Sequence, residues 1–384
     1  VVLLNKELGI VNLSDLEKAL HGDTLKGLFG IGDKKIENIV KGITLFKTSQ
    51  QRISIGMAYP VVKRIIEELK HNPKIEDIQA AGSLRRMKET VGDIDILVSG
   101  AEGTEIVKSF VNMRGVTQIL AAGDTKGSVR IEEGVQVDLR VVREDEFGAA
   151  LQYFTGSKEH NVHLREIARK KGLKVSEYGI FRGDKKVGGR LEEEIYATLG
   201  MDWISPELRE NRGEIEAAQE GKLPKLVELS DIKGDLHNHS NWSDGIPTFE
   251  EMAEHAIKMG YKYLVVSDHS KSLHIANGLE NDELLEEIEA IDKLNKKFKG
   301  FTLLKATEVD IKSDGSLDFP DKLLKKLDIV VASIHSGFKQ GTEKITERMI
   351  AAIRNPQVNI IAHPTGRLIS KREGYEIDMD KVIE

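Results

Sequence analysis

The chain has 384 residues, of which 40% are hydrophobic and 31% are charged, with a formal net charge of −7 and no cysteine. This length predicts two or three folded domains, and no apolar run is long enough to cross a membrane. The absence of cysteine excludes disulfides, thiolate metal sites and cysteine nucleophiles, and it suits a cytoplasmic protein.

The first 50 residues read as short helices broken by glycines. The run that begins at Leu28 resembles a helix-hairpin-helix, whose glycine turn presents backbone N–H groups to a DNA phosphate. The residues expected to contact DNA there are Gly30, Gly32, Lys34 and Lys35. The same glycine spacing also ends ordinary helices, so both interpretations stay open. The acidity of the whole chain does not exclude a DNA-binding segment, because the first 92 residues carry more lysine and arginine than acid.

Regular elements follow between residues 52 and 171. An extended lead-in and a helix over residues 52–70 come first, and a helix over residues 159–171 comes last. Between them, residues 92–98 and 135–142 alternate apolar and polar side chains, which predicts two strands with one buried face each.

These two strands carry three carboxylates. Asp93 and Asp95 alternate along the first strand, so their side chains point to one side about 7 Å apart. Asp138 has the same polarity on the second strand. Such carboxylates would repel one another unless a cation joined them, and two Mg²⁺ ions suit in-line phosphoryl transfer. The alternative is that all three are solvated acids on exposed strand faces.

A candidate phosphate-binding turn lies upstream of the first strand. Gly82 allows the backbone to approach a phosphate, the Ser83 hydroxyl can donate, and Arg86 can form charge-assisted bonds to phosphate oxygens. A Gly-Ser pair followed by a strand with two alternating aspartates is typical of nucleotidyltransferases.

The aromatic segment that follows makes the resemblance more specific. It matches the pattern of family X DNA polymerases at Tyr153, Phe154, Gly156 and Asn161. The match runs from residue 52 to about residue 203 and includes Arg52, Gly82, Ser83, Arg86, Asp93, Asp95, Asp138, Arg140, Tyr153, Phe154, Gly156 and Asn161. It implies an α+β fold, with a nucleotidyltransferase palm over residues 51–144 and a fingers-like domain over residues 145–203. Residues 1–50 would then be a thumb-like DNA-binding segment.

The resemblance also implies roles for single residues. Asp93, Asp95 and Asp138 would be the catalytic metal ligands, and Asp138 would help to activate the primer 3′-hydroxyl. Arg52, Ser83 and Arg86 would bind the triphosphate of the incoming nucleotide, beside Gly82 and Gly156. Tyr153 and Phe154 would pack against its sugar, Asn161 would reach the base edge in the minor groove, and Arg140 would contact DNA. Lys158 departs from the family pattern, which has an acid there, so contacts to the new base pair would differ.

A polar, acid-rich stretch over residues 204–230 predicts a linker, and after it the pattern changes. Short β-like runs that end in polar residues alternate with helical stretches such as residues 248–259 and 282–299, which predicts a parallel sheet or barrel. In such folds the functional side chains lie at the carboxyl ends of the strands. The candidate metal ligands at those ends are His237, His239, Asp244, His269, Glu308, His335 and His363.

Any one of these histidines could be an ordinary buried side chain, but seven potential ligands at successive strand ends favour a metal centre. Nitrogen and oxygen ligands without thiolate suit Zn²⁺ or Mn²⁺. The order of the ligands over residues 231–384 resembles the PHP superfamily of phosphoesterases and polymerase-associated exonucleases. That resemblance implies a distorted (β/α)7 barrel in which Glu308 bridges two ions, with up to three ions in a complete domain. The family completes its site with a later Asp-x-His pair, so we expect a fragment that lacks both termini.

We therefore expect a DNA polymerase for repair gap filling whose PHP domain is a Mn²⁺-dependent 3′→5′ exonuclease. Its partners would be gapped or primer-template DNA and deoxynucleotides, with no membrane partner, and a monomer is favoured. The alternatives are a template-independent nucleotidyltransferase fused to a PHP phosphatase, and a non-catalytic module that binds DNA ends.

Overall fold

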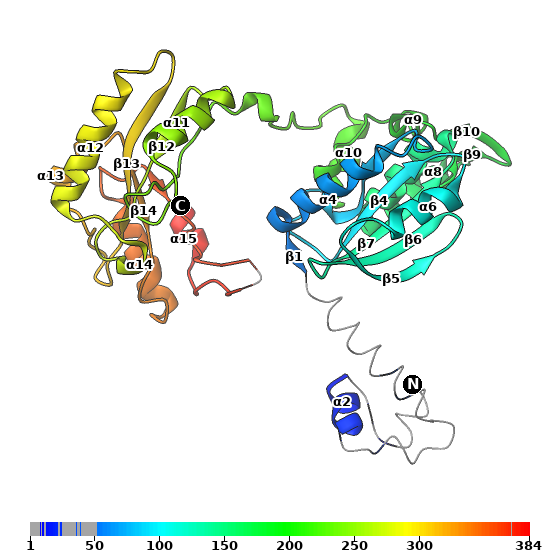
Figure 1. Cartoon of the computed structure of the whole chain (residues 1–384), viewed down its shortest axis with the longest axis horizontal. Coiled ribbons are helices and arrows are strands. Elements are labelled where there is room, and N and C mark those ends of the chain that lie inside the picture. The colour runs from blue at the N-terminus through cyan, green and yellow to red at the C-terminus, as the bar shows by residue number, and fades with distance from the viewer. Residues whose placement is uncertain are drawn as a thin grey trace. The chain divides into compact units, whose positions relative to one another are not determined.

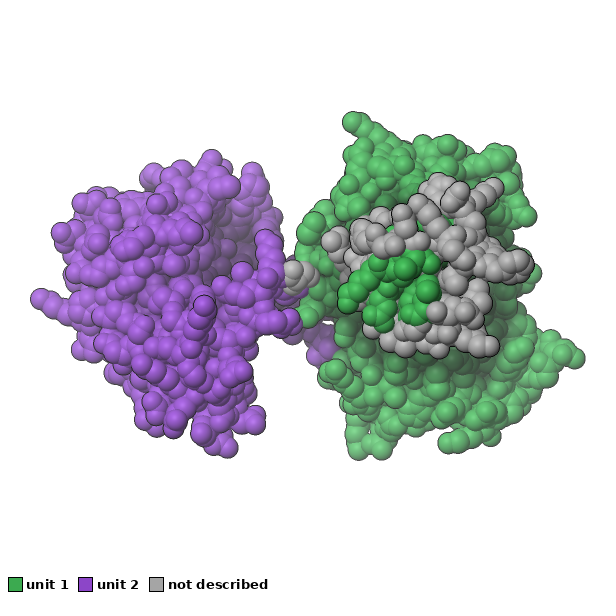
Figure 2. Space-filling model, turned by 90° about the horizontal axis from the view of Figure 1, so that it is seen from below, with its two compact units in different colours: residues 1–224 green, residues 225–384 purple. Residues whose placement is uncertain are grey.

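The computed structural model describes residues 52–369 and 371–384, and before them residues 13–21 and residues 8, 10, 24, 36 and 39. The chain forms two compact units, residues 1–224 and residues 225–384 (Figure 2). Helix α2 (Leu13–His21) belongs to the early segment. The predicted glycine turn with Gly30, Gly32, Lys34 and Lys35 lies outside the described residues.

A five-stranded mixed sheet carries the first candidate site in the described part of unit 1 (Figure 1). Its strand order is β2 (Ile78–Ala80), β4 (Asp93–Ser99), β7 (Gln136–Val142), β6 (Lys126–Ile131) and β5 (Val116–Ala122). Strands β4 and β7 are parallel, and the other neighbouring pairs are antiparallel. The predicted strands at 92–98 and 135–142 are therefore the central pair, whereas β5 and β6 were not predicted.

One face of this sheet is buried by two helices. Helices α4 (Ile55–Leu69) and α6 (Gly103–Val111) share a hydrophobic core with alternate residues of the central strands, among them Ile94, Ile96, Val137 and Leu139. Because strand side chains alternate between faces, this packing directs Asp93, Asp95 and Asp138 to the opposite face.

The rest of unit 1 is a smaller helical and β assembly. It contains α7 (Phe147–Thr155), α8 (Lys158–Lys170), α9 (Glu192–Thr198) and α10 (Glu214–Gln219), with a small antiparallel sheet of β8 (Lys174–Ser176), β9 (Gly179–Arg182) and β10 (Lys185–Gly188). Helix α8 begins after Ser157, whose side chain accepts a hydrogen bond from the backbone N–H of His160 and caps the helix. The predicted helix over 159–171 corresponds to it.

The predicted linker over residues 204–230 contains folded residues of unit 1, which extends to Pro224. Ile215 and Ala218 of α10 lie in the same hydrophobic core as α8 and α9, and the Arg209 side chain is fully buried. The polar composition of residues 204–230 predicted a linker, but Arg209 is buried inside unit 1, where it pairs with Glu192.

Unit 2 is built on a parallel sheet. The order is β11 (Gly234–Asp235), β12 (Tyr263–Val266), β13 (Thr302–Asp310), β14 (Ile329–Ser333) and β15 (Ile360–Ile361). Helices α11 (Phe249–Lys258), α12 (Asn281–Asn295), α13 (Asp321–Leu324) and α14 (Thr342–Ile353) connect the strands, and α15 (Met379–Ile383) follows them. This alternation confirms the parallel sheet that the sequence predicts and fits part of a distorted barrel. Among the described residues, no helix is long and apolar enough to span a bilayer.

A buried ion network ties the part of unit 1 that contains the five-stranded sheet to the smaller assembly. Arg85 donates two hydrogen bonds to Glu192, at 2.8 and 2.9 Å, and Arg209 donates a third at 2.6 Å. The Trp203 indole N–H also donates to Glu192. Burial alone would raise the pKa of Glu192, but the hydrogen bonds from the two arginines lower it to about 2. The carboxylate is therefore ionised at neutral pH.

Replacing Glu192 with Gln is expected to destabilise unit 1 by about 3–5 kcal/mol, because two buried guanidinium groups lose their counter-ion. The stabilisation that Glu192 gives is present above its unfolded pKa near 4.5 and falls as the pH drops toward 2. Urea unfolding can follow Trp203 alone in a Trp242→Phe background, since the chain has two tryptophans. The exposed neighbour Glu193→Gln is the control, and equal unfolding midpoints for the two variants would contradict the role of Glu192.

Candidate active sites

Three carboxylates meet on the face of the central strands that lies opposite the core with α4 and α6 in unit 1. Asp95 stands directly opposite Asp138 in the parallel β4–β7 pair. One oxygen from each of Asp93, Asp95 and Asp138 lies within 4.8 Å of the others. The structure therefore brings together the three residues that the sequence singled out as metal ligands.

The electrostatics of this cluster fit a divalent cation. Burial raises the pKa of Asp95 to about 7, and the charges of Asp93 and Asp138 act in the same direction, against Lys126 and Arg86. A carboxylate that is costly to ionise beside two others becomes stable when a cation replaces its proton. The oxygen-only donor set is the kind that Mg²⁺ prefers.

Gly82 explains how the phosphate-binding turn comes so close to the carboxylates. Its backbone has a φ of +62°, and a Cβ atom there would lie 2.2 Å from Oδ2 of Asp95. Only glycine satisfies both constraints without displacing the carboxylate. Gly82 also starts the short helix α5 (Gly82–Arg85), which places Ser83 and Arg86 next to the site.

The predicted nucleotide-binding arginines have protein partners. Arg52 donates to the Thr90 hydroxyl at 2.8 Å. Arg86 donates to Glu210 at 2.9 Å and also to the backbone carbonyl of Thr155, beside Gly156. Glu210 was not singled out from the sequence. Its carboxylate binds the Arg86 guanidinium group that the family resemblance assigns to the triphosphate.

The predicted DNA-contacting residue Arg140 lies at the carboxylates themselves. Arg140 and Phe154 line a cavity of about 60 Å³ together with Asp95 and Asp138, and the guanidinium carbon lies 5.3 Å from the centre of the Phe154 ring. Lys126 lines the same cavity. It was missed because the strand that carries it, β6, was not recognised.

The remaining predicted nucleotide residues lie on α7 and α8. The rings of Tyr153 and Phe154 meet edge to face at 5.2 Å between centres. Asn161 is buried and donates a hydrogen bond of 2.7 Å to the backbone carbonyl of Tyr153. The structure thus holds Asn161 against the aromatic pair.

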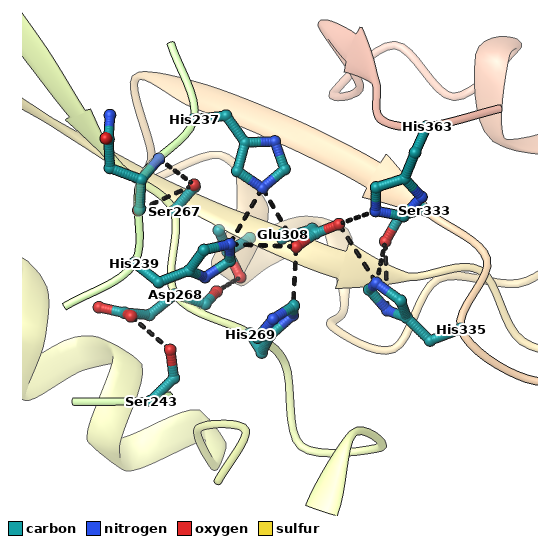
Figure 3. Close-up of polar contacts among 12 residues, drawn as sticks. His237, His239, Ser243, Ser267, Asp268, His269, Glu308, Ser333, His335 and His363 are labelled. Atoms are coloured by element: carbon teal, nitrogen blue, oxygen red, sulfur yellow. Dashed lines mark hydrogen bonds and ion pairs between the residues drawn. The ribbon is translucent and has the colours of Figure 1, made fainter. Parts of the chain in front are cut away.

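The second candidate site is centred on Glu308, which is 1% exposed at the carboxyl end of β13 (Figure 3). In the described residues, five histidines from neighbouring strand ends face its two oxygens. On the Oε2 side, His237, His239 and His269 lie at 3.1, 3.4 and 3.2 Å. On the Oε1 side, His335 and His363 lie at 3.3 and 2.8 Å.

This arrangement fits a carboxylate that bridges two metal ions. Burial alone would raise the pKa of Glu308, but hydrogen bonds from His237, His335 and His363 hold it far below its usual value. Among the described residues, the buried Nδ1 atom of His239 has no hydrogen-bond partner, and that of His269 has only its ion-pair contact with Glu308, as expected of nitrogens set for metal ligation. The residues present therefore fit a metal centre.

Asp244 forms a more open group at the edge of this centre. Its Oδ1 lies 3.8 Å from His239 and 3.7 Å from His269, and its side chain is 47% exposed. These three residues can supply one ligand atom each to a further ion. His363, on the other side, has a backbone φ of +27°, an unfavourable value that surrounding structure must maintain.

Two buried aspartates that the sequence analysis did not select support the histidines. Asp310 is hydrogen-bonded to Nδ1 of His335 at 3.2 Å, and with Glu308 it raises the pKa of His335 to about 9 although burial alone would lower it. Asp268 accepts hydrogen bonds from Ser240 and Ser243, which fixes the loop that carries His239. Strand alternation could have found Asp310, since it lies two residues after Glu308.

Comparisons with known proteins find relatives for both parts of the chain. Residues 150–210 match the model of the DNA polymerase beta thumb, and residues 235–368 match that of the PHP domain. The chain is 42% identical over its whole length to the DNA polymerase/3′-5′ exonuclease PolX of Bacillus subtilis, of which it covers 68%. The chain belongs to the PolX family of DNA polymerases. It is thus a family X enzyme with a PHP domain, and both families are metal-dependent.

Shorter similarities distinguish the two halves. A probable phosphatase of Thermoanaerobacter sp. (strain X514) is 35% identical over 154 residues, which cover 39% of this chain and 58% of that protein. Rat DNA polymerase lambda is 28% identical over 161 residues, 34% of this chain and 28% of that protein. The segment that matches the polymerase beta thumb overlaps the one expected to be fingers-like, residues 145–203, and extends to Arg209 and Glu210.

Replacing Gly82 with Ala is expected to slow templated primer extension roughly 100-fold, because displacing a catalytic carboxylate by about 1 Å has an effect of that size. Gly134→Ala is the matched control: its φ is also positive, at +78°, but no described atom lies within 4 Å of its added Cβ. Single-turnover extension rates measure the difference. Equal rates for both variants would show that the close approach to Asp95 does not matter.

Proposed function

We propose that unit 1 fills gaps in DNA by adding deoxynucleotides to a primer on a template, and that unit 2 removes nucleotides from 3′ ends. The meeting of Asp93, Asp95 and Asp138 on paired strands carries the first half of this proposal. The full-length identity to the Bacillus subtilis DNA polymerase/3′-5′ exonuclease PolX supports both halves. Helix-hairpin-helix binding of DNA by Gly30, Gly32, Lys34 and Lys35 remains part of the proposal.

In the polymerase site the three carboxylates would hold two Mg²⁺ ions, which stabilise the attacking and leaving oxygens when bound. The primer 3′-hydroxyl attacks the α-phosphate, loses its proton, and releases pyrophosphate. Asp138 lies where it would favour loss of that proton. Arg52, Ser83 and Arg86 would hold the triphosphate, and Arg86 would exchange the Glu210 carboxylate for phosphate oxygens.

Nucleotide selection would rest on α7 and α8. Tyr153 and Phe154 would pack against the sugar, and Asn161 would donate to the minor-groove edge of the base. Arg140, which lies beside Asp138 and against Phe154, would contact the primer terminus. Of these residues, Arg140 and Phe154 line the cavity that Asp95 and Asp138 also line.

In unit 2 the histidines and Glu308 would hold Mn²⁺ or Zn²⁺, which activates a water molecule for attack on a phosphodiester. The chain's own contribution is orientation. Glu308 faces ligands on both of its oxygens, Asp310 holds His335, and Asp268 holds the loop after β11. The open position of Asp244 would leave room for a substrate phosphate.

A phosphatase is the second candidate for unit 2, because its 154-residue match is to probable phosphatases. Together with template-independent nucleotide addition in unit 1 it forms the main alternative. A phosphatase would release phosphate from 3′-phosphorylated or small monoesters without shortening DNA. Three aspartates in one group, and four histidines in groups that can each offer ligand atoms to a metal, argue against the non-catalytic DNA-end binder.

The two activities are expected to separate by single substitutions, assayed on a one-nucleotide gap with a labelled primer. Asp138→Ala should lower extension at least roughly 1,000-fold and leave shortening in Mn²⁺ intact, since it removes a ligand of the catalytic cation only. His237→Ala should do the reverse. The controls are the exposed residues Asp184→Ala and His255→Ala. Extension that ignores the template, or phosphate release without shortening, would favour the alternative.

A further inference from the structure

A side chain that the sequence analysis did not select holds Asn161. Gln152 of α7 is 1% exposed, and its Nε2 donates to Oδ1 of Asn161 at 2.6 Å. The Nδ2 of Asn161 donates to the backbone carbonyl of Tyr153 at 2.7 Å. Both ends of the Asn161 amide are therefore bound within unit 1.

These contacts allow one orientation of the amide. A backbone carbonyl can only accept a hydrogen bond, so the end of Asn161 that faces Tyr153 must be the NH₂ group. The opposite end is then the oxygen, and the group that faces it must donate. Gln152 supplies that donor from the interior, whereas the contact with Tyr153 is partly exposed.

A chain of hydrogen bonds also holds His160, the residue before Asn161 on α8. Glu214 of α10 is hydrogen-bonded to Nδ1 of His160 at 2.7 Å, and Nε2 of His160 lies 3.1 Å from the Tyr196 hydroxyl. The pKa of Glu214 is lowered to about 2, against the effect of its burial, so it accepts the Nδ1 proton and leaves Nε2 as the acceptor for Tyr196.

The Tyr196 phenol keeps its proton, because burial raises its pKa. It can therefore donate to Nε2 of His160, so both ring nitrogens of His160 are paired inside unit 1. These bonds fix the start of α8, and the side chain that faces Oδ1 of Asn161 there is Gln152.

We propose that Gln152 is a positioning residue for nucleotide selection: it fixes the amide of Asn161 so that an N–H, not the oxygen, faces the incoming base. This inference rests on the proposed function, in which Asn161 reaches the minor groove. Every Watson–Crick base presents an acceptor there, purine N3 or pyrimidine O2. A fixed donor can therefore accept any correct pair, whereas a reversed amide would place oxygen against oxygen or nitrogen lone pairs.

The test is a double-mutant cycle in the whole chain. Wild type, Gln152→Leu, Asn161→Ala and the double variant are compared for insertion of one deoxynucleotide into a one-nucleotide gap. Gln152→Leu should raise the KM for the nucleotide about five- to tenfold with kcat changed less than about twofold, the size expected for one lost hydrogen bond. In the Asn161→Ala background, Gln152→Leu should have no further effect.

A nucleotide analogue gives an independent readout. 3-Deaza-dATP lacks the N3 acceptor, so wild type should use it about five- to tenfold less well than dATP. Gln152→Leu and Asn161→Ala should both discriminate less, which a general loss of stability would not produce. Gln152→Met, which keeps the length of the side chain, replaces Gln152→Leu if thermal unfolding shows that the leucine variant does not fold.

The outcomes separate this inference from the function on which it rests. Multiplicative effects in the cycle, or undiminished discrimination against 3-deaza-dATP in Gln152→Leu, would overturn the role of Gln152 while templated extension by wild type upholds the polymerase. Failure of wild type to extend the primer by the templated base would overturn both.

Discussion

The gathering of ionisable side chains at the ends of parallel strands is the constraint on which the two candidate sites depend. The parallel pairing of β4 and β7 sets Asp95 opposite Asp138, and the parallel sheet of unit 2 gathers five described histidines around Glu308. Burial and two neighbouring carboxylates raise the pKa of Asp95, and among the described residues the buried Nδ1 of His239 has no hydrogen-bond partner. A divalent cation resolves both problems, and the same cation supplies the chemistry of phosphoryl transfer.

The rest of each unit serves to hold these groups in place. In unit 1, Gly82 brings a backbone turn against Asp95, and the Arg85–Glu192–Arg209 network fixes that turn to helix α9. In unit 2, Asp268 and Asp310 do the same for the histidines. Buried charge therefore has two uses in this protein: the arginine–glutamate network orients neighbouring elements, and the groups around Glu308 and around Asp95 fit a metal ion.

The sequence predicted the sites better than it predicted their supports. Alternation along two strands was enough to group Asp93, Asp95 and Asp138, and the placement of histidines after short apolar runs predicted the second centre. The buried pairing of Glu192 and Arg209 was not predicted, because residues that form a buried ion pair have the same composition as residues of an exposed acidic linker. Lys126 was not predicted because its strand was not recognised. That strand begins with Lys-Gly-Ser and shows little alternation of polar and apolar residues. Gln152 sits in an apolar helix face, where only its partner Asn161 shows why an amide is needed.

Manganese anomalous diffraction from crystals of this chain tests the central claim most directly, because Mn²⁺ can report both centres at once. The account predicts an anomalous peak among the oxygens of Asp93, Asp95 and Asp138, and two peaks on opposite sides of the Glu308 carboxylate. The ion at one of these peaks would be bound by His237 and His239, and the ion at the other by His335 and His363. Crystals in saturating Mn²⁺ that show no peak at either centre, with the histidines still hydrogen-bonded to Glu308, would contradict it.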